Sequence, residues 1–346
     1  MNLNNEIQKS ITDFAKGLEF VPVISQEQLN CYSNKSIDIN EILFNIISSS
    51  KYRRTAIDDE SKTDIRKKIA DAIEKNIPIE FSIPFGGYKN YRIPSYPEAD
   101  WAEIFNLRFM IRYLLPIAIF YQPGVIIYYS YNSEIIHEVN NMPLSFQRAY
   151  ENSFAKLINH FGKQLPSNFQ IKLQQINKLY VNDNEWKSEL QSLFKRNQEK
   201  WETLYDATAR EKKLNSAKHN LILDGERKLQ NLPGDELETE YFKAAMMCDA
   251  IDSLSKRREF NKFSHRIQLV FIRGPKPSIH IGVCEGSTMH FWVGLGVFEF
   301  NKNKVIPNIF SYVQLQELKS NFIYLEVENP FTFISQNFKQ VIIKSN

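Results

Sequence analysis

The sequence predicts an α/β protein: a Rossmann-like, mostly parallel sheet with a helical insertion and a C-terminal portion rich in strands. Runs of β-branched and aromatic residues at 78–84 and 125–130 are typical of buried parallel strands. A helical pattern at 97–121 separates them, and a strand–helix–strand unit predicts a right-handed parallel crossover. Residues 263–346 change to short strand-like runs divided by Gly and Pro turns.

The length of 346 residues exceeds the usual single domain, so two domains or one enlarged α/β domain are expected. We divide the chain into an N-terminal arm at 1–36, a Rossmann-like core at 37–182, a helical insertion or lid at 183–262, and strands at 263–346 that complete or extend the sheet. The formal charge of +3 gives no electrostatic support for nucleic-acid binding.

Cysteine usage and the N-terminus predict a cytoplasmic location. The 3 cysteines are scattered and form no C-x-x-C pair, which fits a reducing compartment. The first residues carry an early acid and no apolar stretch of the kind that begins a signal peptide. The most apolar segment is broken by Arg112, Pro116 and Gly124, so no membrane span is predicted. The sequence is compatible with a homo-oligomer and does not require one.

Helix signals recur through the first half of the chain. Asp38 is a good N-cap for a helix, and a second helix is expected from Ser61 to about Lys75. Pro97 suits the first position of the next helix, with acids in its first turn, and Pro116 is expected to kink or divide it.

The second half carries a helix, a charged helical segment and then strands. Aromatic and leucine residues at helical spacing predict a helix over 143–161, and a charged helical pattern with an apolar stripe covers 183–230. Strand-like runs follow at 266–272, 278–283 and 290–298, and they predict a second sheet or an antiparallel extension of the first.

The turn after the first strand is the strongest candidate site. It holds Gly86, Gly87, Tyr88 and Lys89. Glycines let the backbone approach a ligand closely, and the lysine supplies a point charge or a nucleophilic amine; the alternative is a plain solvated turn. Because parallel strands end at the same edge of a sheet, Lys89 is expected beside Tyr131 and Asn132.

Basic and acidic residues flank this turn in sequence. Arg53 and Arg54 suit a bidentate clamp on phosphate or carboxylate, or else form a solvated basic loop. Glu98 and Asp100 also fit helix capping, whereas Glu103, expected beyond the first turn, is the better candidate for a general acid or base.

The 6 histidines show no metal-ligand spacing, so no metal site is predicted. His280 and His290 lie in strand-like segments, where histidine either hydrogen-bonds within the core or serves acid/base chemistry. Gly294 and Gly296 fall inside an apolar run with no following helix, which favours a packing role over dinucleotide binding. The sequence contains neither a Walker motif nor a G-x-S-x-G elbow.

The order of features over residues 41–160 resembles the isonitrile synthase family, the group of the pyoverdine and dityrosine biosynthesis proteins. The matching elements are Ile42-Leu43, Arg53-Arg54, Ile77-Pro-Ile79, Pro84-Phe85, Lys89-Asn90, Pro97 with Glu103, Tyr121 to Gly124, Ser130 and Tyr150. Later, Tyr241, Arg257-Arg258 and the run from Arg266 are loosely similar. The family has Ser-Asp-Gly after its second strand, whereas Ser130 is followed here by Tyr131 and Asn132. The family's Phe-Pro-x-Lys-Ser run is also altered around Lys89.

The resemblance implies an enzyme that condenses the α-amine of an amino acid, such as tyrosine or tryptophan, with a carbon from ribulose 5-phosphate, without a metal or redox cofactor. In that scheme Lys89 engages the sugar carbonyl or phosphate, Arg53 or Arg54 holds the phosphate, and Glu103 moves protons. The site then includes Ser130 and Asn132. Another transferase of the same fold, acting on an amino acid or phosphorylated metabolite, remains an alternative, as does a non-catalytic binding or effector protein that uses its helical segment.

Overall fold

The structure is a computed structural model. It describes residues 3–20, 24, 26, 29–30, 38–86, 89, 97–131, 133–140, 143–212, 233, 236, 254, 257–271, 276–287, 289–301 and 304–344. Among the helices in these ranges, none is both long enough and apolar enough to cross a membrane.

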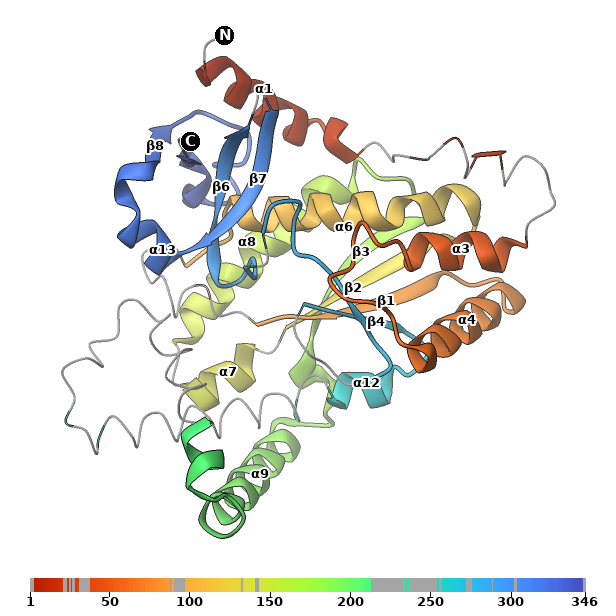
Figure 1. Cartoon of the computed structure of the whole chain (residues 1–346), viewed down its shortest axis with the longest axis vertical. Coiled ribbons are helices and arrows are strands. Elements are labelled where there is room, and N and C mark those ends of the chain that lie inside the picture. Colours follow the sequence, from red (N-terminus) through yellow and green to blue (C-terminus); the bar gives the residue numbers. More distant parts are fainter. Residues whose placement is uncertain are drawn as a thin grey trace.

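A five-stranded parallel sheet forms the centre of the molecule (Figure 1). Its strands are β1 (Ile79–Pro84), β2 (Val125–Tyr131), β3 (Phe169–Gln175), β4 (Ile267–Val270) and β5 (Ile279–His280), in the order β3-β2-β1-β4-β5. All neighbouring pairs are parallel, which confirms the predicted α/β class and the crossover from β1 to β2. The chain moves outward from β1 and then returns to β4, so the strand order reverses between these two strands.

Several helices begin directly after a side chain that caps them. Asp38 accepts a hydrogen bond from the backbone N–H of Asn40 and caps α3 (Ile39–Ile47), as predicted. Asp58, rather than Ser61, caps α4 (Asp59–Glu74), because its carboxylate accepts the Ser61 N–H. Further described helices, besides three treated below, are α1 (Leu3–Ala15), η1 (Leu18–Phe20), α7 (Ser133–Asn140), α8 (Leu144–Gly162), η2 (Ile176–Leu179), α13 (Tyr312–Glu317), η5 (Lys319–Asn321) and η6 (Gln336–Lys339).

The long helix α6 (Trp101–Phe120) differs from its prediction in two ways. It begins four residues after Pro97, because Asp100 has extended backbone angles and forms a capping box with Glu103. The expectation that Glu103 lies beyond the first turn was therefore wrong. Pro116 does not divide the helix. A proline leaves the carbonyl four residues earlier without its helical donor, and here the Tyr52 hydroxyl donates to that Arg112 carbonyl at 3.3 Å.

A second sheet packs on the side of α6 that faces away from the parallel sheet (Figure 1). It contains β6 (Gly294–Asn301), β7 (Lys304–Ser311), β8 (Phe322–Glu326) and β9 (Gln340–Lys344), in the order β7-β6-β9-β8. The C-terminal strands thus divide: β4 and β5 complete the first sheet in parallel, and the later four form the mixed second sheet. Lying between two sheets, α6 is buried along most of its length.

The helical segment is described in part. α9 (Asp183–Thr203) packs through a small apolar cluster that includes Trp186, Leu193 and Leu254. An ion pair of 2.6 Å between Arg258 and Glu185 joins α12 (Arg258–Lys262) to α9. The predicted apolar stripe is thus buried at Trp186, but Leu204 at its far end is 73% exposed. Much of the predicted insertion at 183–262 lies outside the described residues.

Candidate functional site

The strand order places the candidate site at the carboxyl ends of β1 and β4. In open α/β sheets, ligands bind outside the carboxyl ends of the strands where the strand order reverses, and here the reversal falls between these two strands. Two groups of buried polar side chains gather near this edge, one on each face of the sheet.

The first group, the Lys89 cluster, consists of Lys89, Asp100, Glu103 and Tyr150. All four side chains are buried; Lys89 and Glu103 are 0% exposed. The Lys89 amine donates to Asp100 Oδ1 and, at 2.5 Å, to Glu103 Oε2. The Tyr150 hydroxyl donates to Glu103 Oε1 at 2.9 Å. Lys89 comes from the predicted turn after β1, the two acids from the start of α6, and Tyr150 from α8.

Backbone groups hold the acids of the Lys89 cluster. The Asp100 N–H donates to Glu103 Oε2 at 2.7 Å, and the Gly296 N–H of β6 donates to Asp100 Oδ2 at 2.9 Å. A Cβ atom at position 296 would lie 2.4 Å from the Ala102 backbone nitrogen. Gly296 is therefore a packing glycine, as the sequence indicated, since only glycine permits this approach of β6 to α6.

Burial sets the protonation of the Lys89 cluster. Desolvation raises the pKa of Glu103 to about 8, with Asp100 adding to the rise and Lys89 opposing it. A protonated Glu103 beside one ammonium and one carboxylate leaves the buried cluster without net charge. Because the Lys89 amine and the Glu103 carboxyl share a short hydrogen bond, this arrangement can pass a proton between an amine and an acid.

The second group, the Glu259 cluster, lies on the opposite face of the sheet. It consists of Ser82, Ser130, Gln268 and Glu259. Strand register pairs Ser82 with Gln268, and successive side chains of a strand alternate between faces. Tyr129 points toward α6, where its hydroxyl donates to Asn106 Oδ1 at 2.8 Å, so its neighbour Ser130 points the other way.

Glu259 enters this face from α12. Its side chain is fully buried, and its Oε1 accepts a hydrogen bond from the Ser130 hydroxyl. Burial raises the pKa of Glu259 to about 7, and Ser130, Ser82 and Arg266 partly offset that rise. The sequence lacks an acid directly after Ser130, but the fold supplies one from a residue 129 positions away. No spacing in the sequence signals this contact, and sequence reasoning missed it.

Arg266 lies on the same face of the sheet and contacts several side chains there. Its guanidinium donates to Glu80 at 2.9 Å and to Gln174 at 3.0 Å, and its Cζ lies 3.5 Å from the centre of the Tyr128 ring. Arg266 is 3.9 Å from Glu259, farther than from Glu80. Its charge is therefore matched mainly by Glu80.

The predicted basic residues do not form a joint clamp. Arg53 donates to the carbonyls of Ser48 and Thr55, both at 3.0 Å, and so stabilises its own loop. Arg54 donates to the Phe271 carbonyl at 3.1 Å, at the carboxyl end of β4. His280 Nε2 lies 2.8 Å from that same carbonyl. Of the two arginines, the fold thus brings Arg54, together with His280, to the candidate edge.

The remaining predicted residues divide between the core and undescribed segments. Gly86 is buried after β1. His290 stacks on Trp292 with ring centroids 4.7 Å apart, which places it in an aromatic group with Phe85 and Phe271. Gly87, Tyr88 and Asn132 lie outside the described residues. Among the residues that are described, no group of three or more His, Cys, Asp or Glu side chains has the arrangement of a metal site.

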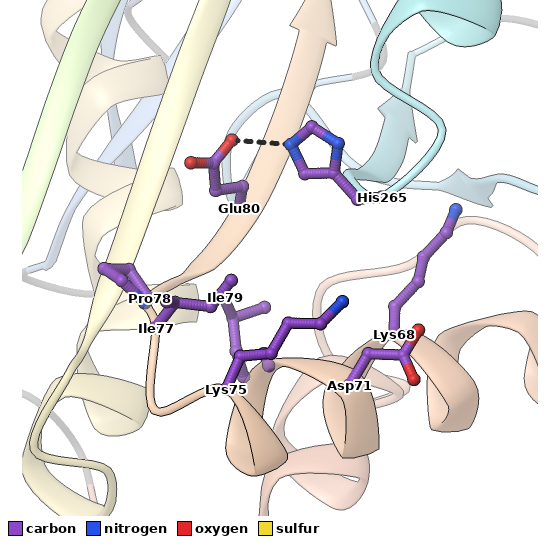
Figure 2. A pocket seen from close by; sticks show the side chains of 9 residues that line it. Lys68, Asp71, Lys75, Ile77, Pro78, Ile79, Glu80 and His265 are labelled. Carbon is purple, nitrogen blue, oxygen red and sulfur yellow. Dashed lines mark hydrogen bonds and ion pairs between the residues drawn. The ribbon is translucent and has the colours of Figure 1, made fainter.

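A pocket of about 270 Å³ lies at the other end of the sheet, beside the first residues of β1. Figure 2 shows Lys68 and Asp71 of α4, with Lys75 directly after it, facing Glu80 and His265. Glu80 Oε2 and His265 Nε2 are 3.2 Å apart. Substrates of this class of sheet bind at the carboxyl ends of the strands. This pocket is therefore separate from the candidate site.

The fold and the buried clusters define a Rossmann-like α/β protein with acid–base groups at its switch point. No family model matches the chain, and no curated protein matches its sequence. The structure is similar to that of the PvcA protein from Pseudomonas aeruginosa, with a TM-score of 0.64 and 15% identity over 89% of this chain and 100% of that one. At this identity the likeness shows a shared fold.

Two other solved structures are more distant. A CDPS from Fluoribacter dumoffii aligns with a TM-score of 0.32 over 63% of this chain and 81% of that chain, at 11% identity. The tyrosyl-tRNA synthetase from Aeropyrum pernix aligns with a TM-score of 0.29 over 67% of this chain and 53% of that chain, also at 11% identity. Neither similarity is strong enough to inform the site.

Proposed function

We propose that this protein is a cytoplasmic biosynthetic enzyme, similar to isonitrile synthases, that joins the α-amine of an amino acid to a carbon of a sugar phosphate, ribulose 5-phosphate. The observation that carries the proposal is the buried Lys89–Glu103 pair beside the carboxyl end of β1. The fold shared with PvcA along that whole chain supports it, as does the motif order from Arg53 to Tyr150.

Lys89 is the proposed nucleophile. An ammonium cannot attack a carbonyl, so the amine must first lose a proton, and the Asp100 carboxylate, whose Oδ1 accepts a hydrogen bond from that amine, is the proposed acceptor. The amine nitrogen then bonds to the sugar carbonyl carbon, and the resulting hydroxyl leaves as water when the protonated Glu103, 2.5 Å from the amine, donates its proton. The product of this step is an imine between Lys89 and the sugar phosphate, with one water released.

Arg54 and His280 are the proposed phosphate partners. Arg54 is exposed, and its one described side-chain contact, with the Phe271 carbonyl, leaves further guanidinium N–H groups to bind an anion. Arg53 uses its donors within its own loop and is the weaker candidate.

Reduction of the imine tests the proposal directly. Purified protein is mixed with ribulose 5-phosphate and sodium borohydride, and the adduct is located by peptide mass spectrometry. We expect one added sugar phosphate on Lys89, none in Lys89→Arg, and an unchanged adduct in Lys62→Arg, whose lysine is exposed on α4. The absence of an adduct on wild-type Lys89 contradicts the imine step.

The second substrate is tested in the same reaction without borohydride. Single L-amino acids are added with ribulose 5-phosphate, and the loss of each is followed by mass spectrometry. We expect consumption of an aromatic amino acid that depends on both Lys89 and the sugar. Consumption with a different phosphorylated carbonyl compound identifies another transferase on this fold, and no consumption of any amino acid overturns the proposal.

A further inference from the structure

The end of α4 forms one wall of the pocket beside the first residues of β1. The helix ends in a Schellman motif, in which Asn76 has a left-handed φ of 51° and the Ile77 N–H donates to the Ala72 carbonyl at 3.0 Å. The Tyr121 hydroxyl lies 2.9 Å from the carbonyl oxygens of both Ala72 and Ile77. These contacts fix the turn, so the pocket wall is formed before any ligand binds.

The pocket has an apolar side that is open to solvent. Ala72, Ile77, Pro78 and Ile79 line it, and Ile77 is 44% exposed. Ligand sites combine such apolar walls with a few polar groups that fix orientation. The volume of about 270 Å³ is just below the roughly 300–1,000 Å³ of pockets for drug-sized molecules. The pocket therefore suits a smaller ligand, of the size of a free amino acid.

Two charged side chains of the pocket are already paired with groups of the protein. The Lys68 amine lies 2.6 Å from Asp64 and donates to the Arg266 carbonyl at 2.9 Å. Glu80 accepts a hydrogen bond from the Arg266 guanidinium at 2.9 Å and lies 3.2 Å from His265. Neither charge is left without a partner for a ligand to supply.

Asp71 and Lys75 are the other two charged side chains of the pocket. Within the described part of the chain, neither has a hydrogen-bond or ion-pair partner. They are four positions apart with the acid first, the order in which helical side chains pair favourably, but they form no ion pair. Figure 2 shows both directed into the space between α4 and the Glu80–His265 pair. One negative and one positive group thus remain available on the same wall.

The charges of the lining favour one class of ligand. Its two lysines and two acids cancel in formal charge. A phosphate group beside Lys75 would also lie near Asp71 and Glu80, where like charges repel it. An amine without a carboxylate would meet the same repulsion from Lys75. A zwitterion places each of its charges beside the opposite one, so it is the class that complements this pocket.

We propose that this pocket is a second ligand site, which binds a free α-amino acid with an apolar side chain. The carboxylate of the amino acid contacts Lys75, its ammonium group contacts Asp71, and its side chain packs on Ile77. The pocket is at the amino end of β1, whereas Lys89 follows the carboxyl end of that strand. An amino acid bound here is therefore not positioned to react at Lys89, and this second site is independent of the proposed reaction.

Binding measurements with matched ligands test the assignment. The probes are leucine, isoleucine, valine, methionine and phenylalanine, followed for each binder by its analogue without the amino group and its analogue without the carboxylate. Inorganic phosphate is the anionic probe. Affinities are measured by ligand-observed NMR. We expect wild-type protein to bind at least one of these amino acids at least tenfold more tightly than either analogue and than phosphate.

Two variants separate the two contacts. Asp71→Asn is expected to lose the tenfold preference for the amino group, and Lys75→Gln the preference for the carboxylate. Glu74→Gln and Lys67→Gln change exposed side chains of α4 that do not line the pocket, so these matched controls retain both preferences. Circular dichroism confirms that each variant is folded, and each pocket variant provides a test if the other does not fold.

Three outcomes overturn the second site: no amino acid binds wild-type protein, phosphate binds more tightly than every amino acid, or both folded pocket variants keep the wild-type preferences. The last outcome would place the bound amino acid elsewhere, for example at the carboxyl ends of the strands. The borohydride experiment on wild-type protein decides the proposed reaction separately. If Lys89 forms no adduct while Asp71→Asn and Lys75→Gln lose their preferences, the second site stands and the sugar-phosphate chemistry fails.

Discussion

Near the same edge of the parallel sheet, the two faces differ in how completely their buried polar groups are hydrogen-bonded. In the Lys89 cluster, the ammonium group, all four carboxylate oxygens and the Tyr150 hydroxyl have partners. In the Glu259 cluster the pairing is incomplete, because the Gln268 amide nitrogen has no partner within the described structure. A fully satisfied network fixes its members in place, whereas an unsatisfied one costs stability until something binds. The comparison separates a network in which every buried polar group is paired from one in which the pairing is incomplete.

Removal of Lys89 is expected to have the largest effect. Lys89→Ala leaves Asp100 and Glu103 buried without their cation, and breaking a buried ion pair typically costs about 3–5 kcal/mol of unfolding free energy. Urea denaturation measures the loss. The control Lys62→Ala removes an exposed pair with Asp59 and should cost less than about 1 kcal/mol. A similarly small loss for Lys89→Ala would show that the cluster does not stabilise the fold.

The pH dependence of stability reports the protonation of Glu103. Its folded pKa of about 8 is above the ordinary value of 4.5, so the folded protein holds a proton that the unfolded chain has released. Stability contributed by this group is complete below about pH 4.5 and is lost as pH rises through 8, with a limiting slope of about 1.4 kcal/mol per pH unit.

Glu103→Gln should flatten this dependence between pH 7 and 8. Glu259 and Glu151 also have raised pKa values, each about 7, and they dominate the pH dependence of stability below about pH 7. Melting temperatures of wild type and variant, taken at half-unit steps, measure the difference. Parallel curves above pH 7 would mean that Glu103 is ionised in the folded protein.

Gly296 tests how closely the second sheet supports the Lys89 cluster. Gly296→Ala places a Cβ atom 2.4 Å from the Ala102 nitrogen, and overpacking of this kind costs about 1–3 kcal/mol. Gly162→Ala is the matched control, since no atom lies within 4 Å of its new Cβ and alanine favours the helix. Thermal denaturation should show that Gly296→Ala is destabilised and that Gly162→Ala is not. Equal effects would show that the close approach of β6 at Gly296 does not help to hold Asp100 in place.

Two buried serines give the most direct contrast between the faces. Ser153 Oγ accepts the Ala99 N–H and donates to the Tyr150 carbonyl, both at 2.8 Å, so Ser153→Ala should cost about 1–3 kcal/mol. Ser82→Ala removes a hydroxyl whose one interaction within the described structure is a long contact with Glu259, and we expect a smaller loss, below about 1 kcal/mol. Chemical denaturation compares the two. Equal losses would show that the Ser82 hydroxyl stabilises the fold as much as the Ser153 hydroxyl does.

Local patterns were sufficient for much of the fold. The buried runs at β1 and β2, the caps at Asp38 and the helix over α8 all follow from short-range sequence. The start of α6 was misplaced because Pro97 and Asp100 are both acceptable starts, and the capping box with Glu103 decided between them. Helix boundaries depend on such single contacts, which composition does not rank.

The sequence by itself determined the α/β class and the parallel crossover and singled out Lys89 as a candidate, since each depends on neighbours within one or two elements. Only the tertiary structure decided what surrounds those residues. Lys89 is buried between two acids, and the Ser130 hydroxyl donates a hydrogen bond to Glu259 of α12, far along the chain. The physical reason is that the cost of burying a charge depends on partners brought together by folding, and sequence spacing does not encode those contacts.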